Sequence, residues 1–108
     1  MCKNSQVTAE INFSDIKFLP GAIDLANDGI IPGGSKRNLE YSEKFVEFDS
    51  ALSKLQKLLA CDAQTSGGLL ISLPDDQADE FIKAFGSKNS SKIGSIISQK
   101  SNLISVKP

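Results

Sequence analysis

The chain has 108 residues, of which 40% are hydrophobic, and its formal net charge is −1. This length allows one domain with a modest core, and the near-neutral charge gives no basic surface for binding nucleic acid. No apolar run is long enough to span a bilayer, and the lack of histidine excludes histidine-based triads and leaves few ligands for zinc within the chain.

The cysteine content and the N-terminal residues bear on the compartment. Two cysteines, Cys2 and Cys61, are too few for a disulfide framework. Polar residues follow Met1 where a secretory signal would be apolar. We therefore expect a reducing, cytoplasmic location and no membrane association.

The first third of the chain predicts a strand and a short helix. Apolar and polar residues alternate over 6–13, which is typical of a strand with one buried face, formed by Val7, Ala9, Ile11 and Phe13. A turn follows at Pro20-Gly21. Residues 22–28 predict a helix that ends at Gly29, because glycine is favoured just beyond a helix C-terminus.

A glycine-rich stretch, IIPGGSKRN, occupies residues 30–38. Pro32 interrupts regular pairing, and Gly33-Gly34 permit a sharp loop. One interpretation is a solvated surface loop. The other is a wall that faces a phosphorylated ligand, with Arg37 able to pair with phosphate or with a carboxylate, although a single loop arginine is more often solvated or in a structural ion pair.

The middle of the chain predicts a short strand at 46–48 and a helix at 51–59, while residues 39–44 favour no element. Asp49 or Ser50 would supply the helix N-cap. Four leucines recur at helical spacing and predict a core-facing stripe: Leu52, Leu55, Leu58 and Leu59.

A second glycine-rich stretch, DAQTSGG, occupies residues 62–68 and is followed at once by an apolar run at 69–73. The run predicts a buried strand. The glycine pair is explained by a turn that enters this strand. Consecutive N–H groups in such a turn also form anion-binding nests, which leaves a phosphate-binding alternative open.

The last third predicts a helix and two strands. Pro74-Asp75-Asp76 begins the helix, Ala78, Phe81, Ile82 and Phe85 form its apolar stripe, and Gly86 ends it. We interpret Asp75 and Asp76 as capping residues rather than a metal site. Strands are predicted around 93–97 and at 103–106, with a hairpin turn at 99–102. The mixed order of helices and strands predicts an α+β fold (mixed α/β), a mixed β-sheet covered by helices.

Two blocks resemble the selenophosphate synthetase (selenide, water dikinase) family: DAQTSGGLL at 62–70, and LPGA at 19–22 followed by GIIPGGSKRN at 29–38. The resemblance implies a single domain over residues 1–108, the C-terminal domain of the aminoimidazole-ribotide-synthetase-like superfamily, with the N-terminal ATP-binding domain absent. The family commonly has proline after the aspartate of its signature, where this chain has Ala63.

The resemblance also implies the chemistry of the full-length protein. That protein makes selenophosphate from selenide and ATP, releases AMP and phosphate, and uses magnesium. The family's reactive Cys or selenocysteine, its neighbouring lysine and its metal-binding aspartates lie upstream of the matched region. We therefore expect no catalytic residue, no metal site and no bound cofactor in this fragment, and neither cysteine inherits the nucleophile's role.

The site that we expect is a wall of the phosphate cleft. It comprises the two glycine-rich stretches, with Asn38, Thr65 and Ser66 as neutral hydrogen-bond donors; its residues are Gly33, Gly34, Ser35, Asn38, Thr65, Ser66, Gly67 and Gly68. The expected partners are the N-terminal ATP-binding domain and a second copy in a homodimer. Two alternatives remain, a hydrogenase-maturation or purine-pathway member of the superfamily, and a stand-alone binding or oligomerisation module.

Overall fold

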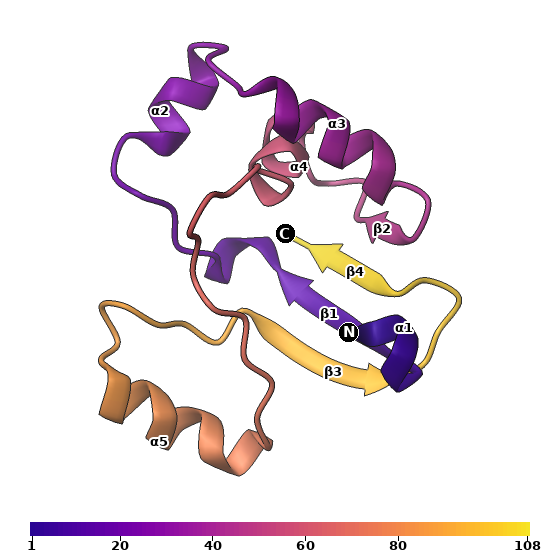
Figure 1. Cartoon of the computed structure of the whole chain (residues 1–108), viewed down its shortest axis with the longest axis vertical. Helices are drawn as coiled ribbons and strands as arrows, with labels where there is room; N and C mark the ends of the chain where they lie inside the picture. Colours follow the sequence, from indigo (N-terminus) through magenta and orange to yellow (C-terminus); the bar gives the residue numbers. More distant parts are fainter.

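The computed structural model describes all 108 residues and shows a four-stranded sheet with helices around it (Figure 1). The elements in chain order are α1 (Cys2–Ser5), β1 (Val7–Asn12), a 3-10 turn η1 (Phe13–Asp15), α2 (Ala22–Asn27), α3 (Gly33–Ser42), β2 (Val46–Phe48), α4 (Lys54–Ala60), α5 (Asp75–Phe85), β3 (Gly94–Ser98) and β4 (Ile104–Lys107). No helix combines the length and the apolar composition that crossing a bilayer requires.

The sheet is mixed, with strand order β2-β4-β1-β3. Strand β4 runs parallel to both β1 and β2, and β3 runs antiparallel to β1. Ala9 at the middle of β1 pairs with Ile96 on one side and Ile104 on the other. The predicted α+β class is confirmed.

The predicted hairpin between the last two strands is wrong, because β1 lies between β3 and β4. The chain between them crosses the end of β1 and is held there by Thr8, which is fully buried. The Thr8 hydroxyl donates to the Asn102 carbonyl at 2.8 Å and accepts from the Lys100 amide at 2.8 Å. Alternation had placed Thr8 on the outward face, so the prediction of a single buried apolar face is also wrong.

Three helices lie together beyond the β2–β4 side of the sheet (Figure 1). Helix α2 ends at Asn27, one residue before the predicted end, and Gly29 follows the C-cap residue with a φ of +80°. Helix α4 starts later than predicted, because Ser53 and Gln56 form a reciprocal capping box. Asp49 instead accepts a hydrogen bond from the Ala51 amide within a turn.

Helix α3 corrects the sequence interpretation of residues 33–44. The stretch predicted as a loop is the start of a ten-residue helix whose N-cap is Pro32. Glycine is a poor helix former, but Ser35 and Leu39 are buried, and their burial stabilises the helical conformation of this segment. Tertiary packing therefore overrides local propensity here.

Helix α5 has the predicted bounds but a different N-terminal arrangement. Pro74 is the N-cap, neither aspartate caps the helix, and Asp75 pairs instead with Lys92. Hydrogen bonding to the Lys92 ammonium, with its charge, lowers the pKa of Asp75. No residue of α5 is buried, and Phe85 is 62% exposed.

Residues 69–73, predicted as a strand, are an irregular segment between α4 and α5. Leu69 is 89% exposed and Leu70 is 65% exposed. No backbone group from residue 64 to residue 73 makes a hydrogen bond within the chain. A strand exists only beside another strand, and none of the four strands pairs with this run.

Glu10 joins two lysines on the surface of the sheet. Its carboxylate accepts from Lys100 at 2.9 Å and from Lys107 at 3.1 Å. These hydrogen bonds, the one from Lys100 above all, lower the pKa of Glu10. The contacts of Glu10 with the two lysines therefore stabilise the folded state at neutral pH, and this stabilisation is lost as the pH falls through the lowered pKa of Glu10.

Candidate functional site

The first turn of α3 packs directly against the start of the stretch at residues 62–68, called here the 62–68 turn. Ser35 is fully buried, and its hydroxyl donates to Asp62 Oδ1 at 2.6 Å. The same Ser35 oxygen accepts from the Ala63 amide at 3.4 Å. The two glycine-rich stretches, 27 residues apart at this contact, are thus side by side.

Two further contacts join α3 to Cys61, the residue before the 62–68 turn, and to Ala63 within the turn. The Asn38 amide donates to the Cys61 carbonyl at 3.1 Å. A Cβ on Gly34 would lie 2.8 Å from Ala63 Cβ, closer than side chains pack. Glycine at this position therefore lets the helix backbone approach the turn, while Gly33 has room for a side chain.

The outer part of the 62–68 turn is open to solvent. Gln64 donates to Asp62 Oδ2 at 2.6 Å, which folds the turn back on itself. Ser66 has a φ of +54°, a left-handed conformation that non-glycine residues rarely adopt. Thr65, Ser66, Gly67 and Gly68 are all exposed, and their N–H groups have no partner in the chain.

Charged side chains lie on α3 and at its first turn. The Asp62 carboxylate lies at the helix's first turn, where the positive end of the helix dipole favours an anion. Lys36 and Arg37 are exposed on the same helix and form no ion pair. Helix α3 therefore carries two unpaired cations in addition to the residues that contact the turn.

The structure shows no metal-binding cluster. No group of three or more Cys, Asp and Glu side chains is placed to hold a metal ion. Cys2 and Cys61 are free thiols, and the nearest polar side-chain partner of Cys61 is the Ser42 hydroxyl at 3.5 Å. What the site presents is a set of exposed neutral donors, with the Asp62 carboxylate at the base of the turn.

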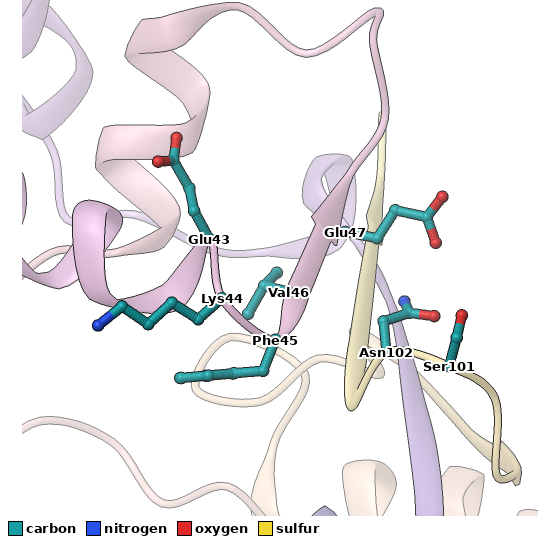
Figure 2. A pocket seen from close by; sticks show the side chains of 7 residues that line it. All are labelled: Glu43, Lys44, Phe45, Val46, Glu47, Ser101 and Asn102. Carbon is teal, nitrogen blue, oxygen red and sulfur yellow. The ribbon is translucent and has the colours of Figure 1, made fainter.

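A separate shallow hollow surrounds the start of β2 (Figure 2). It is lined by Glu43, Lys44, Phe45, Val46, Glu47, Ser101 and Asn102. Glu47 and Lys44 extend away from each other on opposite sides of the strand (Figure 2). Its polar side chains are divided between the two sides of the strand, so the hollow is not the candidate site.

Comparison with known proteins adds sequence relatives. The chain is 48% identical over 82 residues, 76% of its length, to the selenide, water dikinase of Aliarcobacter butzleri (strain RM4018). It is 36% identical over 109 aligned positions, 98% of its length, to the selenide, water dikinase of Clostridioides difficile (strain 630). No protein-family profile matches the chain.

Over most of its own length the chain is similar to the selenide, water dikinases. It spans only about a quarter of the length of the relatives it matches, 24% of the Aliarcobacter butzleri protein and 31% of the Clostridioides difficile protein. It is therefore comparable with one segment of a selenide, water dikinase.

Sequence reasoning placed Gly34, Ser35 and Asn38 in the site but missed the residues that they contact. Asp62 was noted only as part of the glycine-rich stretch, yet it accepts hydrogen bonds from both Ser35 and Gln64. The sequence shows Ser35 directly after the glycine pair at 33–34, and it shows Asp62 a few residues before the glycine pair at 67–68. It does not show their pairing, because the pairing depends on how α3 packs.

Proposed function

We propose that this chain forms the C-terminal part of a selenide, water dikinase, which makes selenophosphate from selenide and ATP and releases AMP and phosphate. The observation that carries the proposal is the 48% identity to the Aliarcobacter butzleri enzyme over 76% of the chain. The packing of the 62–68 turn on α3 supports it, since both elements lie in the resembling blocks.

Within that enzyme, the chain would provide a wall of the phosphate cleft. The exposed N–H groups and hydroxyls of the 62–68 turn are neutral donors with no partner in the chain. Such donors stabilise the charge that develops in phosphoryl transfer without forming covalent bonds. In this proposal the upstream part of the protein holds magnesium, ATP and the reactive residues.

The exposed apolar surface supports docking on that upstream part. A compact monomer of 11.6 kDa exposes about 5,800 Å², whereas this chain exposes 7787 Å². The excess is roughly 2,000 Å², more than the about 800 Å² that each partner buries in a standard protein–protein interface. Residues 69–73 and the apolar stripe of α5 supply much of the exposed apolar surface, and we propose that the N-terminal ATP-binding domain covers them, within a cytoplasmic homodimer.

A chimera tests the proposed activity. This chain would replace its matching segment in the Aliarcobacter butzleri enzyme, and AMP release from ATP would be measured with and without selenide. We expect selenide-dependent AMP release within about tenfold of the parent enzyme, a change in barrier of about 1.4 kcal/mol. The parent lacking the segment is the control and should release none. A folded chimera that binds ATP but forms no AMP with selenide would refute the proposal.

A further inference from the structure

We infer that Ser35 and Asn38 are positioning residues, which hold the 62–68 turn in the geometry that its exposed donors need. The inference rests on the proposed function for what the turn does, but not for how the turn is held. It assigns to α3 a role in ordering the turn, through side chains whose polar atoms point at the turn.

Ser35 is directed away from any ligand. Its side chain is fully buried, its proton goes to the Asp62 carboxylate, and its oxygen accepts from the Ala63 amide. The contact with Asp62 is charge-assisted, which makes it stronger than a hydrogen bond between neutral groups. The hydroxyl proton and one of its lone pairs are used in these contacts, so the Ser35 side chain acts on the turn.

The turn has few other restraints. From residue 64 to residue 73 the backbone forms no hydrogen bond within the chain. The turn is fixed at its start by the contacts from Ser35 and Asn38, and internally by the bond from Gln64 to Asp62. One carboxylate oxygen of Asp62 thus accepts a hydrogen bond from Ser35 on α3, and the other accepts one from Gln64 in the turn. A displacement of Asp62 would therefore also displace the turn.

This arrangement has a consequence for catalysis. Donors that stabilise a transition state work because they are fixed before the reaction, and a displacement of about 1 Å can cost about a hundredfold in rate. Loss of the Ser35 hydroxyl should therefore lower kcat in the chimera about tenfold to a hundredfold. The KM for ATP should change much less, because in the proposed enzyme the upstream part binds ATP.

Amide hydrogen exchange in the 108-residue chain tests the inference independently of activity. Ser35→Ala should speed exchange about tenfold at Asp62 and Ala63, the two amides of the turn that donate hydrogen bonds, the effect of losing one hydrogen bond to a charged group, and leave the sheet unchanged. Asn38→Ala, at an exposed position, should act in the same direction and serves if Ser35→Ala does not fold. Glu40→Ala is the matched control, since Glu40 is exposed on α3 and makes no hydrogen bond.

The outcomes separate the two claims. Exchange at Asp62 and Ala63 that matches the Glu40→Ala control in both variants would overturn the positioning role, whatever the activity. Faster exchange with an unchanged kcat in an active chimera would overturn the catalytic consequence. An inactive chimera with native Ser35 would count against the proposed function, and the exchange result would still decide whether α3 holds the turn.

Discussion

Replacing Gly94 by alanine should lower the free energy of unfolding by about 3 kcal/mol or more, among the largest effects of a single substitution. Gly94 lies opposite Ile11 where β3 pairs with β1. A Cβ at Gly94 would lie 1.9 Å from the backbone oxygen of Glu10, and also 2.9 Å from the Cα of Ile11. Backbone atoms cannot move aside as a flexible side chain can, so the two strands must separate.

Thermal unfolding followed by circular dichroism measures this effect. For a domain of this size each kcal/mol corresponds to roughly 4–8 °C, so the midpoint should fall by more than about 10 °C. Gly68→Ala is the control, because a Cβ there meets nothing within 4 Å and the residue has no positive φ. Equal midpoints for the two variants would show that β3 does not pair with β1 in this register.

Replacing Thr8 by valine should lower the free energy of unfolding by about 2–4 kcal/mol, because two backbone groups lose their partner. The substitution keeps the shape of the side chain and removes the hydroxyl. The Asn102 carbonyl and the Lys100 amide have no other hydrogen-bond partner in the chain. The loss should appear as a lower denaturant midpoint with an unchanged slope.

Thr65→Val provides the control for this substitution. Thr65 is exposed and its hydroxyl makes no hydrogen bond within the chain, so the change should stay within about 0.5 kcal/mol. If Thr8→Val were as mild as Thr65→Val, the crossing of residues 99–103 over the end of β1 would not depend on this side chain.

The elements with local signals were predicted correctly. Gly29 and Gly86 lie just beyond the ends of α2 and α5 as expected, and alternation located β1. The errors arise where distant parts of the chain decide the structure. The β3–β4 hairpin failed because β4 pairs with β1 and β2, and residues 69–73 failed as a strand because an apolar run does not specify its neighbour.

In the candidate site, too, the sequence indicated the local features but not the contacts between distant residues. Composition and resemblance pointed to two glycine-rich stretches, and the structure has them side by side. Which atoms join them could not be read from the sequence, because the loop predicted at Gly33 is the start of α3 and turns Ser35 inward. That the exposed part of the 62–68 turn faces phosphate stays a prediction.

Amide hydrogen exchange in the chimera, with and without ATP and magnesium, tests most directly whether the 62–68 turn forms the wall of a phosphate cleft. We predict that ATP slows exchange at Thr65, Ser66, Gly67 and Gly68, whose N–H groups are unpartnered in the chain, and leaves the loop at 87–90 unchanged. Unchanged exchange at the turn under conditions where ATP is bound would contradict the placement of these residues in the cleft.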